Sequence, residues 1–268
     1  KTITSTLTGA AIVNGYPINT TTPVFGAMLG EKSLHTDDGR KRTVTVEHLL
    51  TMSSGLNCDD SDQESPGNED RMQEQQEQPD WVQYTLDLGM IREPGEKSVY
   101  CSCNPNLLGG VLARTTGRWI PELFDELIAR PMQFQHYAIN LMPNGEGYMG
   151  GGTRLLPRDF LKLGQMMLDG GIWNGKQIVS RDWAERATSQ QVTLDGHGYG
   201  YYWWIEKYPR GQDTLTAFFA GGNGGQIVMA IPQLDMVIEF FAGNYSDAVF
   251  LTLQREYVPK YIIPAAIK

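Results

Sequence analysis

Apolar residues at helical spacing open the chain. They recur at every third or fourth position and are Ile3, Leu7, Ala10 and Ala11. Alternating threonine and isoleucine would also suit a strand, but the spacing and the Asn14–Gly15 stop favour a helix over residues 1–14. Because no capping residue precedes this helix, we expect part of the protein to lie upstream of Lys1.

The middle of the chain carries further patterns of this kind, and they predict a run of short helices. The predicted ranges are 46–52 behind the cap Thr45, with a stop at Ser54–Gly55; 107–114 before Gly117; 120–128; and 157–169 between Pro157 and Gly170. Residues 58–80 differ from these segments, since they hold nine Asp or Glu residues against Arg71 alone. That composition predicts a solvated surface loop.

Beyond residue 197 the pattern is typical of strands. Short aromatic or β-branched runs, "YGYYWWIE", "LTAFFA", "QIVMAI" and "MVIEFFA", alternate with Gly, Pro, Asn and Asp and predict an antiparallel sheet. Residues 232–235 predict the hairpin turn between the last two strands. Trp203 and Trp204 are adjacent, so at most one of them faces a pocket. Ser246 is expected to cap a final helix with Val249, Leu253 and Tyr257 on one stripe.

In this order the elements predict an α/β lobe and a mainly helical lobe. Residues 1–15 and 186–268 form the predicted α/β lobe, an antiparallel sheet with the first and last helices. Residues 16–185 form the predicted helical lobe. Both ends of the chain would therefore build the same lobe.

Composition narrows the classes of function. With 268 residues, 41% of them hydrophobic and 20% charged, the chain is typical of a globular enzyme. The net charge of -9 argues against a nucleic-acid partner. Its apolar runs fall short of the roughly 20 residues of a membrane span. The glycines of "AGGNGGQ" lack the strand–loop–helix setting of a phosphate cradle, so no cofactor is implied.

The stretch "YCSCN" at residues 100–104 raises three alternatives: half a metal site, a nucleophile, or a disulfide beside a functional tyrosine. The chain has three cysteines, Cys58, Cys101 and Cys103, so at least one sulfur lies outside any internal disulfide. Zinc is disfavoured, because no histidine lies close in sequence to the C-x-C; the four are His35, His48, His136 and His197. The G-x-S-x-G and H-E-x-x-H motifs are absent from the sequence.

Five blocks in order resemble the β-lactamase-related serine hydrolases. They are "KTITSTLTGAAIVNGYPINTTTPV", "TVEHLLTMSSGL", "PGEKSVYCSCNPNLLGGVLARTTG", "GGGTRLLPRDFLKLGQMMLDGG" and "GGNGGQIVMAIPQLDMVIEFFAGNY". That family includes class C β-lactamases, family VIII-type esterases, D-amino-acid peptidases and nylon-oligomer hydrolases. The resemblance implies a β-lactamase/transpeptidase-like fold, an antiparallel sheet flanked by helices with a helical second lobe.

The resemblance also implies the site residues. Lys1 matches the lysine of the Ser-x-x-Lys motif, whose serine would lie three residues upstream, and Tyr100 with Ser102 matches the Tyr-x-Asn or Tyr-x-Ser motif. Gly222 and Asn223 fall in the third motif and are expected at the oxyanion hole. Ala220 stands where the family usually has a lysine or histidine that grips a substrate carboxylate. Neutral esters or amides are therefore favoured over penicillins.

The expected chemistry requires an activated serine. A lysine can accept its proton only when burial lowers the lysine pKa, and moving that pKa from about 10.4 to near 7 costs about 4–5 kcal/mol. Tyr100 would share the proton and pass it to the leaving group. If Tyr100 and Ser102 face the site as alternate residues of a strand, Cys101 and Cys103 face away from substrate. A thiol nucleophile is therefore disfavoured.

We therefore predict a serine hydrolase of carboxylesterase, amidase or peptidase type, with weak β-lactamase activity as an option. The rival interpretation is a β-lactamase-like binding module that has lost its chemistry. A Cys58–Cys101 disulfide is predicted, only weakly favoured over Cys103 as the partner, and it would imply a periplasmic or secreted protein. The expected partners are a small ester or amide substrate and a missing N-terminal segment or companion chain. Without that part, the 268 residues are expected to be inert.

Overall fold

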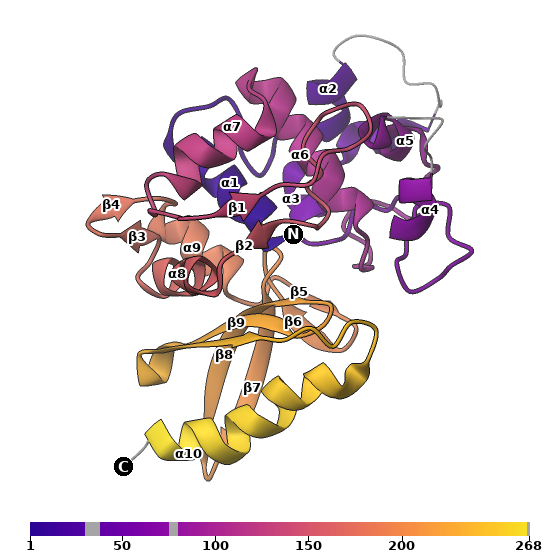
Figure 1. Ribbon diagram of the computed structural model, residues 1–268. Helices are drawn as coiled ribbons and strands as arrows, with labels where there is room; N and C mark the ends of the chain where they lie inside the picture. Colours follow the sequence, from indigo (N-terminus) through magenta and orange to yellow (C-terminus); the bar gives the residue numbers. More distant parts are fainter. Residues whose placement is uncertain (30–37, 75–79, 267–268) are drawn as a thin grey trace.

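The computed structural model describes residues 1–29, 38–74 and 80–266. A six-stranded antiparallel sheet lies beside a group of helices (Figure 1). The C-terminal helix, which runs from the π-helical segment Leu253–Ile262 into α10 (Ile263–Ala266), covers the far side of the sheet. The sheet order is β10-β9-β8-β7-β6-β5. Its strands are β5 (Val192–Leu194), β6 (His197–Tyr199), β7 (Trp204–Arg210), β8 (Asp213–Gly222), β9 (Gln226–Ile231) and β10 (Met236–Phe241). This confirms the predicted antiparallel sheet.

Helices and short ribbons fill the rest of the chain. The helices are α1 (Thr2–Val13), α2 (Val24–Leu29), α3 (Val46–Leu50), α4 (Glu69–Glu74), α5 (Trp81–Asp87), α6 (Cys103–Thr116), α7 (Ile120–Phe124), α8 (Pro157–Leu168), α9 (Arg181–Ala187) and α10 (Ile263–Ala266). Two-residue strands form two small ribbons, β1 (Tyr137–Ala138) with β2 (Arg154–Leu155) and β3 (Ile172–Trp173) with β4 (Lys176–Gln177). The helical middle of the chain is as the patterns predicted.

Helix α1 is buried on all sides. Its residues from Thr2 to Ala11 are all buried, although every second one from Thr2 to Thr8 is a threonine. The Thr2 hydroxyl donates to the carbonyl of Tyr202 at 2.8 Å, and the Thr4 hydroxyl donates to the carbonyl of Met149 at 2.7 Å. Because these hydroxyls are hydrogen-bonded, burying them costs little folding free energy. They fix α1 and the Lys1 that precedes it against distant parts of the chain.

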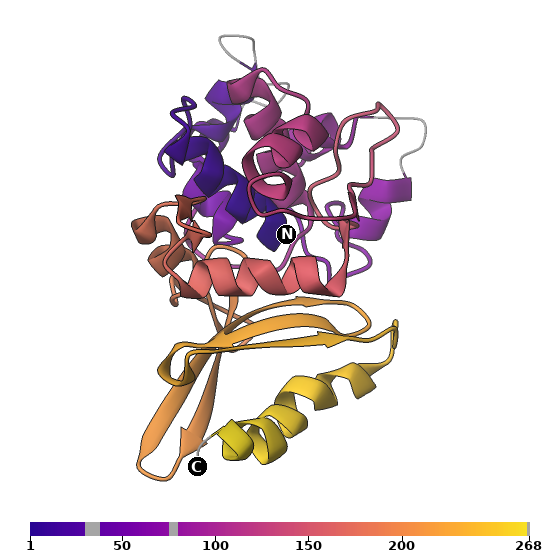
Figure 2. The same cartoon turned by 60° about the vertical axis from the view of Figure 1, so that its left-hand side comes forward.

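Helices cover both faces of the sheet (Figure 2). Helix α8 packs on β9 and β10, where Gly164 lets the helix come close to Val228 and Val237. The other face forms a second core cluster in which Met229 lies with Val258 and Ile263 of the C-terminal helix. The sheet is thus the middle layer of three.

The β9–β10 turn falls where the sequence predicted it. Pro232–Leu234 forms a single 3₁₀ turn, and Asp235 takes a left-handed conformation with φ of 46°. Aspartate tolerates that region better than most residues, which explains the tight reversal. On the preceding β8–β9 turn, Gly224 and Gly225 both have φ of 96°, a region that favours glycine.

Three local expectations were wrong. The last helical segment is capped by Asp247 rather than Ser246, and Val249 and Tyr257, which were expected on one apolar stripe, are 48% and 46% exposed. Helix α3 ends at Leu50, before the expected stop, because Met52 adopts a left-handed φ of 57°. The acidic segment is more than a solvated loop, since it contains α4 and buries Asn68 and Met72. Its residues 75–79 lie outside the described part of the chain.

The division into two lobes remains a prediction. Helix α1 was expected beside the sheet and α8 in the helical lobe, and the structure places both differently. Helix α1 packs on α6 among the helices, whereas α8, from the middle of the chain, covers the sheet. Among the described residues, no helix is both long and apolar enough to span a membrane.

Candidate active site

Lys1 and Tyr100 meet where α1 begins. Lys1 occupies the N-cap position of α1, and its Nζ lies 4.8 Å from the centre of the Tyr100 ring. Tyr100 lies two residues before Ser102, the N-cap residue of α6. The fold therefore brings together two predicted site residues that are 99 positions apart in the sequence.

The charge of Lys1 is set by two opposing effects. Burial lowers its pKa, but Tyr100, Glu69 and Asp60 together outweigh burial and raise the pKa above the ordinary value. The expectation of a lysine with a depressed pKa was therefore wrong for this arrangement. Lys1 is an ammonium ion that lies beside the ring of Tyr100.

Tyr100 also lines a pocket of about 300 Å³. Gly222 and Asn223, at the end of β8, line it together with Tyr100, so residues of two predicted motifs share one pocket. Its other lining residues are His197, Trp204, Phe219, Gly221, Ile227, Phe250, Leu251, Gln254 and Arg255. The pocket thus joins the helical part of the chain to the end of the sheet.

The two adjacent tryptophans divide as predicted. Trp203 is fully buried in the core, whereas Trp204 lines the pocket. Ala220 is 4% exposed and belongs to the core, so the third-motif position that usually carries a cation presents none to the pocket. The positive group that lines this pocket comes instead from Arg255 on the C-terminal helix.

Ser102 does not line the pocket. It is fully buried, and its hydroxyl donates to Asp60 Oδ2 at 2.6 Å. The alternation argument fails here because the chain turns into a helix at Cys103, so residues 100 and 102 do not share one face. A direct contact of Ser102 with substrate remains a prediction that this geometry does not favour.

The three cysteines form one buried cluster. Cys58 and Cys101 are joined as a disulfide with their Cα atoms 5.7 Å apart, and Cys103 is the free thiol. All three sulfurs lie within 4.8 Å of one another. Two sulfurs bonded to each other cannot ligate a metal ion, and burial raises the pKa of the Cys103 thiol to about 12. Cys103 is therefore an inert thiol at neutral pH.

Sequence reasoning missed Asp60 and Glu69 as neighbours of Lys1. Both come from the acidic segment, and both act electrostatically on the Lys1 ammonium. The Glu69 carboxylate also accepts a hydrogen bond of 2.5 Å from the Tyr148 hydroxyl. The excess of acidic residues was the available signal, but the sequence does not say which of them turn inward.

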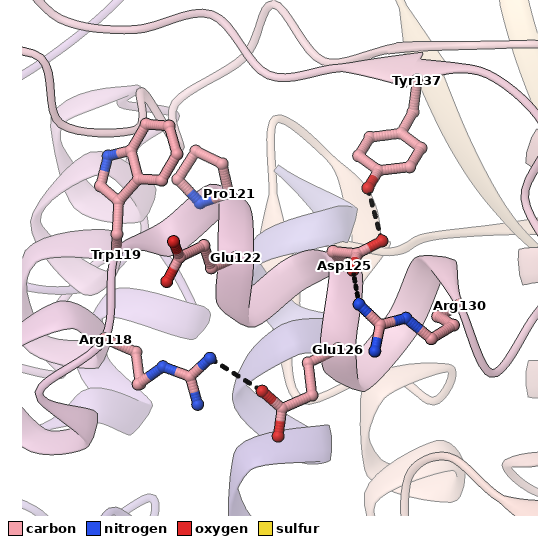
Figure 3. Close-up of a pocket in the computed structure, with 8 residues that line it drawn as sticks. All are labelled: Arg118, Trp119, Pro121, Glu122, Asp125, Glu126, Arg130 and Tyr137. Atoms are coloured by element: carbon pink, nitrogen blue, oxygen red, sulfur yellow. Dashed lines mark hydrogen bonds and ion pairs between the residues drawn. The ribbon is translucent and has the colours of Figure 1, made fainter.

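A larger groove of about 510 Å³ lies elsewhere, along α7 (Figure 3). Most of its charges pair with one another: Arg118 with Glu126 at 2.8 Å, and Asp125 with both Arg130 and the Tyr137 hydroxyl. Its lining contains none of the predicted site residues. The size of a groove alone therefore does not locate the chemistry, and the smaller pocket beside Tyr100 is the candidate site.

Residues 1–250 match the family model described as Beta-lactamase. The chain belongs to this family. A curated relative, the 6-aminohexanoate-dimer hydrolase of Paenarthrobacter ureafaciens, is 30% identical over 151 residues, which are 52% of this chain. The chain spans 37% of the length of that relative.

Two solved structures share the fold of this chain. A D-stereospecific amidohydrolase from Streptomyces sp. superposes with a TM-score of 0.66 over 99% of this chain and 84% of its own, at 17% identity. A penicillin-binding protein from Bacillus halodurans superposes with a TM-score of 0.68 over 96% of this chain and 82% of its own, at 16% identity. These comparisons confirm the predicted family and its β-lactamase/transpeptidase-like fold.

Proposed function

We propose that this beta-lactamase-family protein hydrolyses an ester or amide through an acyl-enzyme, with Tyr100 and Lys1 moving the proton. The observation that carries the proposal is the position of Lys1 Nζ, 4.8 Å from the centre of the Tyr100 ring. A half-buried cation beside a tyrosine at the wall of a pocket is an arrangement suited to proton transfer by that tyrosine.

The raised pKa of Lys1 assigns the roles within this pair. Lys1 stays an ammonium ion beside Tyr100. In the reactive form that we propose, Tyr100 is deprotonated and takes the hydroxyl proton of the motif serine, which the family resemblance puts three residues before Lys1, while the serine oxygen bonds to the substrate carbonyl carbon. The alcohol or amine then leaves with that proton, and water releases the acyl group by the same steps in reverse.

The opposite wall supplies the binding groups. The backbone N–H of Asn223, at the end of β8, would donate to the oxyanion, and a donor of this kind is worth about 3–4 kcal/mol. Because Ala220 is buried and uncharged, neutral esters and amides suit the site better than penicillins. The names of the two hydrolase relatives, a 6-aminohexanoate-dimer hydrolase and a D-stereospecific amidohydrolase, support amides within this class.

One observation favours the rival function, a binding module without catalysis. Ala220 departs from the cation usual at this position, so part of the family machinery is altered.

We propose also that an upstream segment or a companion chain completes the site, and that the protein is periplasmic or secreted, as the Cys58–Cys101 bridge requires an oxidising compartment.

Labelling of the full-length protein with a fluorophosphonate probe tests the function. An activated serine reacts with the probe, and Tyr100→Phe and Lys1→Ala are each expected to slow labelling and p-nitrophenyl ester hydrolysis by about 10²–10⁴-fold. Tyr137→Phe is the matched control, because this tyrosine lines the groove along α7, and its rate should be unchanged. A wild-type protein that neither labels nor hydrolyses esters or amides would establish the binding module instead.

A further inference from the structure

Asp60 binds the Tyr100–Ser102 segment from both its backbone and its side chain. Its backbone N–H donates to the carbonyl of Tyr100 at 2.9 Å. Its carboxylate oxygen Oδ2 accepts from the backbone N–H of Ser102 at 2.8 Å and from the Ser102 hydroxyl at 2.6 Å. Three hydrogen bonds therefore join one residue to the two neighbours of Cys101.

The covalent bond between Cys58 and Cys101 lies between these contacts. Cys58 precedes Asp60 by two residues, and Cys101 is the middle residue of the segment that Asp60 binds. The disulfide and the Asp60 hydrogen bonds consequently tie the same two stretches of chain together. The other carboxylate oxygen, Oδ1, accepts from the backbone N–H of Glu69 at 3.1 Å, which extends the attachment to the start of α4.

The burial of Ser102 explains why a carboxylate at position 60 stabilises this segment. It is fully buried, so its N–H and hydroxyl cannot find water and need an acceptor within the protein. A single carboxylate oxygen serves both donors, and hydrogen bonds to a charged acceptor are stronger than neutral ones. The charged groups around Asp60 are Lys1 and Glu69, and Lys1 is the site cation itself.

We infer that Asp60 is a positioning residue, which holds Tyr100 at Lys1 through its hydrogen bonds to Tyr100 and Ser102, with the Cys58–Cys101 bridge holding Asp60 in place. The inference rests on the proposed function, because the step that Asp60 serves is proton transfer by Tyr100. Asp60 itself does not line the pocket. It acts on the position of the tyrosine and on the charge balance at Lys1.

Asp60→Asn in the full-length protein tests this role. The amide keeps the size of the side chain but replaces one oxygen by a donor and removes the charge. We expect kcat for a p-nitrophenyl ester to fall about ten- to a hundredfold, because small displacements of a catalytic group have effects of this size. KM should change less than about threefold, since Asp60 does not contact the substrate. Loss of the anion lowers the pKa of Lys1, so the pH profile of kcat should move toward lower pH.

Asp59→Asn is the matched control. Asp59 is the preceding residue, and its carboxylate also accepts a backbone N–H and a hydroxyl, both from Ser61, at 2.9 Å and 2.6 Å in an exposed part of the loop. This variant should keep kcat and the pH profile of the wild type. Ser102→Ala gives an independent measurement from the other side of the contact. In the double variant Asp60→Asn/Ser102→Ala, kcat should fall by less than the product of the two factors by which it falls in the single variants.

The outcomes separate the two proposals. An active wild type whose kcat and pH profile are unchanged in Asp60→Asn, or whose kcat falls equally in Asp59→Asn, overturns the positioning role alone. If Asp60→Asn does not fold, an unchanged kcat and pH profile in Ser102→Ala overturns it as well. A wild type that hydrolyses neither esters nor amides overturns the proposed function and this role with it.

Discussion

Trp204 stacks on Tyr100, with ring centroids 5.8 Å apart and ring planes inclined by 21°. Trp204 begins β7 and also stacks on Phe219 of β8 at 6.5 Å, and it meets the edge of Tyr199 at 4.7 Å. The sheet therefore supports Tyr100 on one side, while Lys1 lies on the helical side. The orientation of the tyrosine depends on both parts of the structure.

Removing this support should lower activity while leaving the fold intact. Trp204→Ala is expected to reduce kcat/KM about tenfold, because an aromatic pair contributes roughly 0.5–1.5 kcal/mol beyond its buried area. Trp204→Phe should retain most of the activity, since a smaller ring can still stack. Steady-state kinetics on the full-length protein measures kcat/KM of these variants. Trp119→Ala, in the groove along α7, is the control. Equal activity in Trp204→Ala and the wild type would show that the stacking is incidental.

The disulfide predicts a definite number of thiols. Thiol counting on denatured, unreduced protein should find one free cysteine, Cys103, and native protein should resist alkylation at pH 8, because burial raises the pKa of this thiol to about 12. Closing a loop with a sequence separation of 43 residues stabilises the folded state by about 4 kcal/mol in the chain-entropy model. Cys58→Ser should therefore lower the free energy of unfolding by several kcal/mol, whereas Cys103→Ala should change it much less. Three free thiols would contradict the bridge.

Glu239 on β10 predicts how stability depends on pH. One of its carboxylate oxygens is buried without a hydrogen-bond partner among the described residues, and burial raises its pKa from 4.5 to about 7, against the attraction of Arg158. Between these two values the folded state binds more protons than the unfolded state, so stability falls as the pH rises. The loss is complete above about pH 7, where both states are ionised.

Glu239→Gln should remove this loss. We expect its melting temperature at pH 8 to exceed that of the wild type by about 2–4 °C, and the difference to vanish below about pH 4.5, where the glutamate is protonated in both states. Thermal unfolding followed by circular dichroism between pH 4 and pH 8 measures it. Glu185→Gln, on the exposed face of α9, should show no such dependence. A variant that is less stable than the wild type at pH 8 would contradict the assignment.

Strand β10 predicts a tendency to associate. In the described part of the chain β10 pairs with β9 alone, and its last residue, Phe241, is 53% exposed. An apolar edge strand invites pairing with another chain. Phe241→Lys should raise the monomer fraction of the 268-residue chain in size-exclusion chromatography, because a charged side chain on an edge opposes such pairing. If our proposed upstream segment pairs with β10, the full-length protein should be monomeric without this change.

Local pattern determined much of the fold. Helical spacing from Ile3 to Ala11 predicted α1, Pro157 and Gly170 marked α8, and the alternating runs after residue 197 predicted the sheet. These elements depend on the periodicity of side chains and on the backbone preferences of glycine and proline, which are properties of neighbouring residues. The resemblance to a known family depends on ordered local blocks for the same reason, and it supplied Lys1 and Tyr100.

Only the tertiary structure decided how the site is held. Whether Ser102 faces the pocket or Asp60 depends on where the acidic segment folds back, and nothing near Asp60 in sequence distinguishes it from Asp59, whose carboxylate binds the exposed Ser61 instead. The sign of the Lys1 pKa shift likewise depends on charges that lie 59, 68 and 99 residues away. Electrostatic interactions and burial act through space, so a linear pattern of residues contains no information on which charges meet.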